Sequence, residues 1–311
     1  MGRIAAIFPG QGAQSVGMGR DVVAAYPAAR EVFDRAGQVL GVDLASVCFN
    51  GPPEALEATD IQQPAIFTTS VAIWCAMREV APSGFRFDAA AGLSLGEYTA
   101  LHVAGGLTFE DALRVLARRG QLMQEAARAR PGGMISLMGL EPDQVRRLCE
   151  EAADAGVVRP ANFNCPGQIV VSGERPACER VLALAEQRGA RAVVLKVAGA
   201  FHSPLMQPAS DGLREALAGT AVQTPSIPVF ANVNAQPHRD PDTIRDWLVQ
   251  QVVQPVQWQS IIENLIRSGF DRFVEIGPGK TLSGLVRRID RNVSAVSINS
   301  AAAVEQFKET L

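Results

Sequence analysis

The sequence predicts an α/β protein with a mainly parallel sheet and an inserted ferredoxin-like subdomain. Short apolar segments of strand length alternate with longer segments of helical periodicity, an order typical of a parallel sheet that helices cover on both faces. A continuous stretch in the middle of the chain has the order βαββαβ, which is the split arrangement of a ferredoxin-like unit. The composition, with 47% hydrophobic and 20% charged residues, is that of an ordinary globular enzyme.

The first part of the chain begins with an apolar strand that ends in the glycine-rich turn Gly10-Gln11-Gly12. A long apolar helix is predicted to begin around Pro64, because a proline in the first turn of a helix needs no hydrogen-bond partner for its nitrogen. Thr108 is the expected N-cap of a later helix. The predicted strands are 3–8 and 89–93, and the predicted helices are 19–26, 28–40, 63–80, 96–102 and 109–129.

The pattern changes at Pro131-Gly132-Gly133, where the inserted unit begins. Its predicted strands are 134–140, 157–163, 168–172 and 191–197, with helices 142–155 and 175–188. After Gly199 the larger pattern resumes, with strands 229–232 and 272–276 and helices 204–217, 243–252, 257–268 and one from Thr281. We therefore predict a large subdomain over residues 1–130 and 199–311 and a small subdomain over residues 131–198.

Charge and hydropathy argue against several classes of protein. The formal net charge of −3 does not favour nucleic-acid binding by the chain as a whole. No segment approaches the roughly 20 apolar residues that span a bilayer, and the first residues pass directly into a strand, so neither a membrane segment nor a targeting peptide is expected. Scattered cysteines predict neither a metal site nor a disulfide framework, and they fit a reducing cytoplasm; they are Cys48, Cys75, Cys149, Cys165 and Cys178.

The segment 114–130 is rich in arginine, with Glu125 as its only acidic residue. Two interpretations of this segment stay open. It is either a solvated helix face, or a surface for an anionic ligand or an acidic partner. The arginines are Arg114, Arg118, Arg119, Arg128 and Arg130.

The segment Gly92-Leu93-Ser94-Leu95-Gly96 has the Gly-x-Ser-x-Gly form of a nucleophile elbow. A strand of small residues precedes it and a helix follows, and this setting holds the serine in a strained, exposed conformation. The N–H of Leu95, the residue after the serine, is then the usual first oxyanion donor. The alternative is that Ser94 caps an ordinary helix.

Among the three histidines, His202 is the best-placed base. It follows a predicted strand and a Gly-Ala turn, and ligands gather at the carboxyl ends of the strands of a parallel sheet. A serine hydroxyl needs a neighbouring base near neutral pH, and imidazole is the natural one. We expect His102 to pack in the core and His238 to lie exposed in a polar loop. No acid is evident as a third member. Asp211 would face away from the ring but stays one alternative, and a backbone or side-chain carbonyl that fixes the tautomer of His202 is the other.

Two segments look like nucleotide-binding motifs but depart from them. The turn at Gly10-Gln11-Gly12 lacks the third glycine of the dinucleotide fingerprint, where Ser15 stands. The segment 275–281 ends like a phosphate-binding loop, but Val274 occupies the place of the first glycine. We interpret the second segment as a turn that packs a strand against a helix. Neither segment supports a nucleotide enzyme.

Taken together, these motifs resemble the malonyl-CoA:acyl carrier protein transacylases, a family that includes the discrete acyltransferases of polyketide synthases. The resemblance covers nearly the whole chain and implies a hydrolase-like α/β core with an inserted ferredoxin-like unit. Besides the elbow, which continues into Glu97-Tyr98, the matching segments are Phe8-Pro9-Gly10-Gln11-Gly12-Ala13-Gln14, Gln63-Pro64-Ala65, Arg119-Gly120, Asn162-Phe163-Asn164-Cys165-Pro166-Gly167-Gln168, Phe201-His202-Ser203, Pro255-Val256-Gln257-Trp258 and Glu275-Ile276-Gly277-Pro278-Gly279.

The resemblance implies a ping-pong mechanism through a serine ester. By position, Ser94 would attack the malonyl thioester and His202 would take its proton. The N–H groups of Gln11 and Leu95 would hold the oxyanion, and the main-chain carbonyl of Gln251 would orient the histidine. The malonyl group would then pass to the phosphopantetheine thiol of an acyl carrier protein.

The resemblance also implies which residues bind the substrate, malonyl-CoA, and it implies no tightly bound cofactor. Arg119 would form a bidentate ion pair with the free malonyl carboxylate, a geometry that guanidinium fits and ammonium does not. Gln63 and Asn162 match positions that line the pocket. Phe201 resembles the malonyl-selecting version of its turn, where a bulky side chain leaves little room for a branched acyl group.

The chain departs from the family pattern at Leu93, where the family usually has a histidine. Because residue 93 flanks the nucleophile and is not the base, catalysis should survive. The alternatives are an editing acyl hydrolase or an acyltransferase of different acyl specificity on the same fold, a non-catalytic module that binds a carrier protein and, more remotely, a nucleotide-binding enzyme. Arg119 argues against a hydrolase, which needs no cation for a free carboxylate, and the Ser–His pair argues against the module. The sequence does not separate fatty acid from polyketide synthesis.

Overall fold

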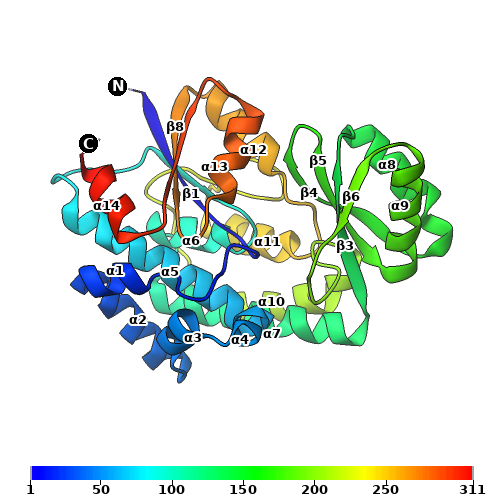
Figure 1. The fold of residues 1–311 in the computed structure, drawn as a ribbon. Coiled ribbons are helices and arrows are strands. Elements are labelled where there is room, and N and C mark those ends of the chain that lie inside the picture. The colour runs from blue at the N-terminus through cyan, green and yellow to red at the C-terminus, as the bar shows by residue number, and fades with distance from the viewer. Residues whose placement is uncertain (1, 310–311) are drawn as a thin grey trace.

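The computed structural model describes residues 2–309 and contains two separate sheets (Figure 1). In the larger sheet every pair of neighbouring strands is parallel, which confirms the predicted mainly parallel sheet. Its strands, in spatial order, are β7 (Val229–Phe230), β2 (Ala89–Gly92), β1 (Arg3–Phe8), β8 (Phe270–Ile276) and β9 (Ser294–Ile298).

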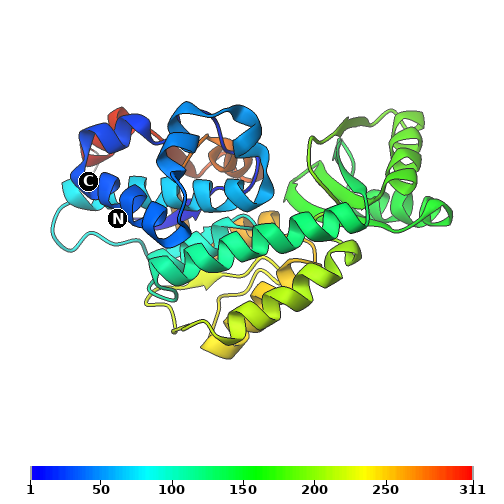
Figure 2. The same cartoon turned by 90° about the horizontal axis from the view of Figure 1, so that it is seen from below.

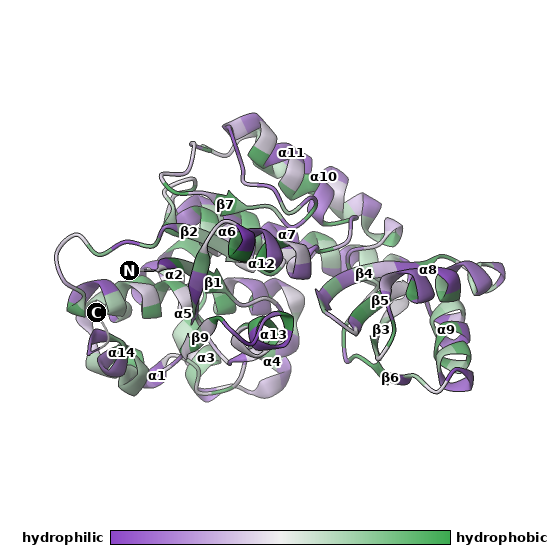
Figure 3. Ribbon diagram, turned by 90° about the horizontal axis from the view of Figure 1, so that it is seen from above, coloured by the Kyte–Doolittle hydropathy of each residue, from purple (hydrophilic) through white to green (hydrophobic). Residues whose placement is uncertain are grey.

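Helices cover both faces of the large sheet because alternate residues of its buried strands point to opposite sides. In β1, Ile4, Ala6 and Phe8 pack in one core, and Ala5 and Ile7 pack in the other. The first core includes residues of α5 (Thr59–Val80), α6 (Gly96–Val103) and α7 (Phe109–Ala129), and the second includes residues of α12 (Trp258–Arg267) and α13 (Thr281–Ile289). Figure 3 shows hydrophobic residues gathered in the central strands of this sheet.

The small sheet is antiparallel and has the strand order β4-β5-β3-β6. Residues from its strands and from the two helices of the unit share a core of their own. In chain order the elements are β3 (Gly132–Met138), α8 (Pro142–Glu151), β4 (Val158–Cys165), β5 (Gln168–Glu174), α9 (Arg175–Gln187) and β6 (Arg191–Val194). This order and topology confirm the ferredoxin-like βαββαβ unit. In Figure 2 the unit forms a separate lobe at the end of α7. The subdomain boundaries at 131 and 198 stay a prediction.

Further helices complete the large lobe around the sheet. The helices α3 and α14 were not expected from the sequence. Each begins at a side-chain cap: Asp43 accepts from the N–H of Ser46, and Ser300 accepts from the N–H of Ala303. The short helix α4 and the strand β9 were also not expected. The helices that complete the large lobe are α1 (Arg20–Ala25), α2 (Pro27–Leu40), α3 (Leu44–Asn50), α4 (Pro53–Glu57), α10 (Gln207–Ala218), α11 (Pro241–Gln251) and α14 (Ala301–Lys308).

The long helix α5 begins before the predicted Gln63, at Thr59, so Pro64 lies inside it. The N–H of Gln62 already donates to the carbonyl of Ala58, at 2.8 Å. A proline at the sixth helical position removes only the one hydrogen bond to the carbonyl four residues earlier, and the helix continues through it. Among the helices of residues 2–309, none is both long enough and apolar enough to cross a bilayer.

Candidate active site

The segment 92–96 forms a tight turn between β2 and α6, and both of its glycines are sterically required. A Cβ on Gly92 would lie 2.0 Å from the carbonyl of Gly96, and a Cβ on Gly96 would lie 2.2 Å from the carbonyl oxygen of Phe8. Ser94 between them has a φ of +54°, a left-handed conformation that costs a non-glycine residue free energy. The turn therefore presents the Ser94 hydroxyl at the end of a parallel strand, in a backbone conformation that the surrounding structure must hold.

Ser94 and His202 lie within hydrogen-bonding distance, with 2.9 Å between Oγ and Nε2. On the other side of the ring, Nδ1 lies 2.7 Å from the main-chain carbonyl oxygen of Gln251. A carbonyl only accepts, so Nδ1 carries the proton and Nε2 is free to accept the serine proton. The carbonyl stands where some serine enzymes place an acid, and Asp211 lies on the surface, where it accepts from Gln207.

The imidazole of His202 is buried, and this burial governs its charge. Loss of solvation, reinforced by the positive charge of Arg119, lowers the pKa of His202 from 6.5 to about 4. The hydrogen bond to the Gln251 carbonyl acts in the opposite direction and is the weaker effect. The ring is therefore neutral at physiological pH, which is the state a general base needs.

The sequence argument that placed His202 directly after a strand of the parallel sheet was wrong. The preceding strand, β6, belongs to the antiparallel sheet and ends at Val194 instead of residue 197. Its ladder with β3 ends at the pair Val194–Ile135, and one more main-chain hydrogen bond joins the N–H of Leu195 to the carbonyl of Met134, at 2.9 Å. His202 comes from the segment that returns from the small lobe to the large one, and its φ of +56° is left-handed, like that of Ser94.

Arg119, from the middle of α7, is a buried cation whose hydrogen-bond acceptors are all neutral. Its Nη1 donates to Gln63 Oε1 at 2.7 Å, and its Nη2 donates to Gln251 Oε1 at 2.9 Å and to Ser94 Oγ at 3.1 Å. Within residues 2–309 it forms no ion pair, and its Nε has no hydrogen-bond partner. Burial lowers the pKa of Arg119 from its ordinary value. Such a group is costly to bury without an anion, so the site is suited to an anionic ligand.

The arginine-rich stretch divides into two environments, which answers the question left open by the sequence. Arg119 alone is buried at the site. The other arginines of the stretch are more exposed, and three of them lie near acidic side chains, as a solvated helix face would: Arg114 with Asp111, Arg118 with Glu125, and Arg130 with Glu174.

A cavity of about 190 Å³ opens beside Ser94 and His202, between the two sheets. Gln11, Asn162 and Phe201 line it, as do residues from both lobes. Gln63 was expected on the pocket wall but lies behind it, fully buried against Arg119. Part of the wall comes from Met134, Asn164, Gln168, Val170, Leu195 and Val197 of the small lobe and the segment after it.

The first turn of the chain lies next to the elbow. A Cβ on Gly10 would fall 2.5 Å from the carbonyl oxygen of Leu93, so only glycine allows this approach. Within residues 2–309, the main-chain N–H groups of Gln11 and Leu95 donate no hydrogen bond. Two unpaired donors beside a nucleophile are what an oxyanion hole requires.

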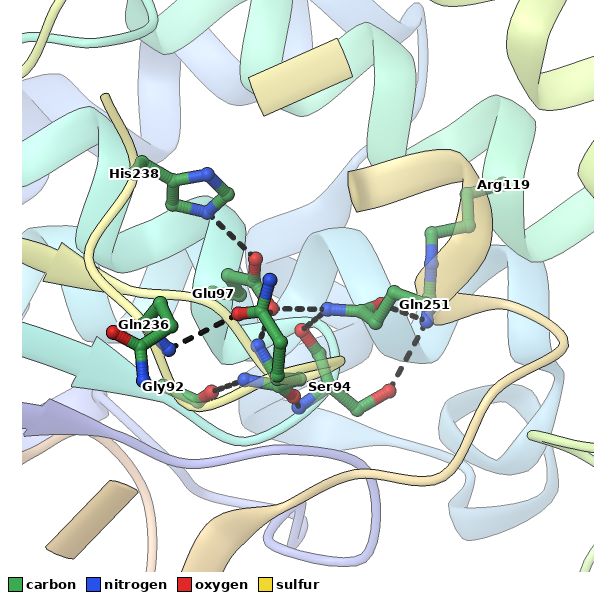
Figure 4. Close-up of polar contacts among 9 residues, drawn as sticks. Gly92, Ser94, Glu97, Arg119, Gln236, His238 and Gln251 are labelled. Carbon is green, nitrogen blue, oxygen red and sulfur yellow. Dashed lines mark hydrogen bonds and ion pairs between the residues drawn. The ribbon is translucent and has the colours of Figure 1, made fainter. Parts of the chain in front are cut away.

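His238 was expected to be exposed, and this prediction was wrong. It is buried, and its Nε2 lies 2.8 Å from Oε1 of Glu97, which is completely buried (Figure 4). Burial of the Glu97 carboxyl group requires polar partners, and the loop folds inward to supply one. His102 packs edge-on against the rings of Phe67 and Phe109, as expected of a core residue.

Sequence reasoning missed Asn232, whose side chain holds the elbow. Its Oδ1 accepts from the N–H of Ser94 at 2.6 Å, and its Nδ2 donates to the carbonyl of Gly92 at 2.7 Å. The available signal was its position two residues after β7, the strand that pairs with β2, because polar residues at the carboxyl ends of neighbouring parallel strands meet at one edge. The segment 275–281 behaves as predicted, since Glu275 caps α13 through the N–H groups of Leu282 and Ser283.

Comparison with known proteins agrees with this geometry. The family model of the acyl transferase domain matches residues 6–308. The chain is 40% identical to the malonyl CoA-acyl carrier protein transacylase of Bacillus subtilis (strain 168), over 100% of this chain and 98% of that protein. It superposes with a TM-score of 0.96 on the malonyl-CoA:acyl carrier protein transacylase of Xanthomonas oryzae, at 42% identity over 100% of this chain and 98% of that one.

A third similar structure is a malonyl-transacylase in complex with a type II polyketide acyl-carrier protein. It has a TM-score of 0.95 and 39% identity, and the match covers 99% of this chain and 100% of that chain. Similarity at this level over the full length shows family as well as fold. The chain belongs to the acyl transferase domain family and is an acyltransferase.

Proposed function

We propose that the protein transfers the malonyl group of malonyl-CoA to the phosphopantetheine thiol of an acyl carrier protein, through a malonyl ester on Ser94. The observation that carries this proposal is Arg119, a buried cation that contacts the Ser94 hydroxyl and has no anionic partner within residues 2–309. A malonyl thioester brings a free carboxylate to the same place as its reacting carbonyl. The names of the relatives support the same substrate and acceptor.

In the first half-reaction, His202 Nε2 takes the proton of Ser94 as Oγ attacks the thioester carbonyl of malonyl-CoA. The N–H groups of Gln11 and Leu95 stabilise the oxyanion of the tetrahedral intermediate. The C–S bond then breaks, the protonated histidine returns the proton to the CoA sulfur, and the malonyl ester remains on Ser94. The main-chain carbonyl of Gln251 holds the ring through both proton transfers.

The second half-reaction is the same chemistry in reverse, with a different thiol. His202 takes the proton of the carrier's phosphopantetheine thiol, and the sulfur attacks the ester carbonyl. Ser94 leaves and recovers the proton from the histidine. The two thiols use the same site in turn, and the malonyl group stays on Ser94 between them. The kinetics should therefore be ping-pong.

Substrate selection follows from the walls of the cavity. The carboxylate takes the place of neutral acceptors on the Arg119 guanidinium, in a bidentate ion pair. Phe201, buried beside His202, limits the room for a branched acyl group, and Asn162 supplies a polar contact on the cavity wall. Arg119 also argues against an editing hydrolase, because simple acyl esters offer it no anion.

All five cysteines are free, which supports a reducing compartment such as the cytoplasm.

Mass spectrometry of the intact protein tests the proposal. After mixing with malonyl-CoA, the wild type should carry one malonyl group, located on Ser94 by peptide mapping, and the Ser94→Ala variant should carry none. Adding a phosphopantetheinylated carrier protein should remove the adduct and place it on the carrier thiol. Absence of an adduct on Ser94 of the wild type would refute the function. A panel of fatty acid and polyketide carriers would identify the acceptor.

A further inference from the structure

Glu97 lies directly under the elbow, and the transfer chemistry described above gives it no role. It is in the first turn of α6, and none of its surface is exposed. A buried carboxyl group is costly unless its oxygens are paired. Three nitrogens lie within hydrogen-bonding distance of the Glu97 carboxylate (Figure 4). Its Oε2 lies 2.9 Å from the main-chain N of Asn232 and 2.7 Å from Nε2 of Gln251. Its Oε1 lies 2.8 Å from Nε2 of His238.

The first of these contacts leads to the nucleophile. Glu97 fixes the main chain at Asn232, and the side chain of Asn232 fixes the turn by accepting from the N–H of Ser94 and donating to the carbonyl of Gly92. Ser94 has a left-handed φ, so its conformation persists only if neighbouring groups hold it. We call this chain of contacts the asparagine arm.

The second contact leads to the base and to the cation. Gln251 donates from Nε2 to Glu97 and to the carbonyl of Ser94, at 3.0 Å, and accepts at Oε1 from Arg119. Its main-chain carbonyl accepts from His202, whose φ is also left-handed. One glutamine thus touches all three reactive side chains or their backbones, and Glu97 anchors its amide. We call this chain of contacts the glutamine arm.

We propose that Glu97 is a positioning residue that aligns Ser94 with His202 through the asparagine and glutamine arms. The inference rests on the proposed function for its chemistry. Glu97 does not line the cavity, so it acts on the reaction only through these neighbours. Proton transfer needs the 2.9 Å contact between Ser94 and His202. A displacement of about 1 Å in such a contact costs on the order of 100-fold in rate.

His238 has a different part in this arrangement. It pairs with Oε1 and touches neither arm, and its ring packs at 5.3 Å from the ring of Trp247. Its Nδ1 has no partner within residues 2–309, so the tautomer with the proton on Nε2 leaves only an acceptor unpaired. His238 therefore satisfies the second oxygen of Glu97 without being needed to hold the arms, and this makes it a matched control.

The test compares Glu97→Leu with the conservative Glu97→Gln and with His238→Gln. The leucine removes all three of these contacts at similar volume. The glutamine keeps an amide oxygen for Asn232 and Gln251 and turns its NH₂ toward His238, which can accept in its other tautomer. The rate of Ser94 acylation is measured in a single turnover with malonyl-CoA, by rapid quench and intact mass. We expect Glu97→Leu to be at least about 100-fold slower than the wild type. The acylation rates of Glu97→Gln and His238→Gln should stay within about fivefold of the wild-type rate, far below the roughly 100-fold loss expected of a displaced dyad.

Three results would overturn the inference: a Glu97→Leu rate within threefold of the wild type, equal losses in Glu97→Leu and Glu97→Gln, or an equal loss in His238→Gln. If circular dichroism shows that Glu97→Leu does not fold, Gln251→Met replaces it. This variant leaves the Glu97–His238 pair and the main-chain carbonyl in place and should lose about 30-fold or more, within the range expected of a misplaced dyad. A wild-type rate in Gln251→Met would equally overturn the inference.

A crystal structure of Glu97→Leu, or of Gln251→Met in its place, separates this inference from the proposed function. Ser94 Oγ and His202 Nε2 should lie beyond hydrogen-bonding distance in the variant. An unchanged contact would overturn the positioning role whatever acyl group the enzyme carries. A wild type that takes no malonyl group would instead refute the proposed function and leave this structural expectation standing.

Discussion

Replacing Arg119 by alanine should abolish the preference for malonyl-CoA over acetyl-CoA in the acylation of Ser94. Arg119 is 1% exposed, and the hydrogen-bond acceptors of its guanidinium are two amide oxygens and a hydroxyl. A malonyl carboxylate would be its first anionic partner. Hydrogen bonds to charged groups contribute about 1.5–3 kcal/mol each, so a bidentate pair contributes roughly 3–6 kcal/mol, a range that includes the roughly 3–5 kcal/mol cost of breaking a buried ion pair.

These free energies translate into large and selective rate effects. Since about 1.4 kcal/mol corresponds to a tenfold change, Arg119→Ala should lower kcat/KM for malonyl-CoA by roughly 10²–10⁴-fold. Acetyl-CoA has no free carboxylate, so its kcat/KM should fall only by the contribution of the 3.1 Å contact between Arg119 and Ser94, which is about tenfold. Arg119→Lys keeps the charge without the planar pair of donors, so its loss with malonyl-CoA should fall between these values.

The assay is single-turnover acylation, followed by intact mass with each acyl-CoA in turn. Arg118→Ala is the matched control, because Arg118 is the preceding residue of the same helix, is exposed, and lies 3.9 Å from Glu125 across solvent. We expect this control to behave like the wild type with both substrates. Equal fold losses with malonyl-CoA and acetyl-CoA in Arg119→Ala would refute the assignment of the carboxylate to Arg119.

Three further predictions concern pH, stability and the size of the acyl group. Because the pKa of His202 is lowered to about 4, Ser94 acylation should stay constant from pH 8 to about 5.5 and fall only below that; a rate profile with its midpoint near 6.5 would contradict this. In the unfolded chain His202 binds a proton near pH 6.5, whereas in the folded chain it stays neutral down to about pH 4. The free energy of unfolding of the wild type should therefore fall by about 2 kcal/mol more than that of His202→Gln between pH 7 and pH 5. Denaturant unfolding at the two pH values measures this difference. Phe201→Ser should admit methylmalonyl-CoA, and unchanged discrimination in a competition assay would exclude Phe201 as the selecting residue.

The elbow could be predicted from sequence because its geometry is local. Gly92, Ser94 and Gly96 lie within one turn, and the steric demands on both glycines arise from strand and helix segments that the pattern already identifies. His202 could be found by elimination among three histidines, although the argument from a parallel strand was wrong. The strand before it belongs to the small antiparallel sheet, and no periodicity states which of two sheets a short strand joins.

The buried network under the elbow could not be predicted in the same way. Glu97 meets Asn232 and His238 across 135 and 141 residues of sequence, and a glutamate in an amphipathic pattern normally indicates an exposed face. His238 lies in a loop rich in polar residues, which favours exposure when the loop is considered alone. Only the fold, by bringing β7 beside β2, places a buried carboxyl group next to this loop. Long-range pairing of polar groups is therefore the part of the site that sequence reasoning missed.

The unfavourable features of the described structure concentrate at the proposed site. Of its three non-glycine residues with positive φ, two are Ser94 and His202, and the third, Ala235, follows Asn232 by three residues. Arg119 adds a buried charge without an anion. Each of these features costs folding free energy, so the elbow, the histidine turn and the cation must be held by the rest of the molecule. The Glu97 network, which is well paired and lies beneath all three, is the part of the structure placed to hold them. Loss of this network should therefore appear in the rate of acylation and in the stability of the fold.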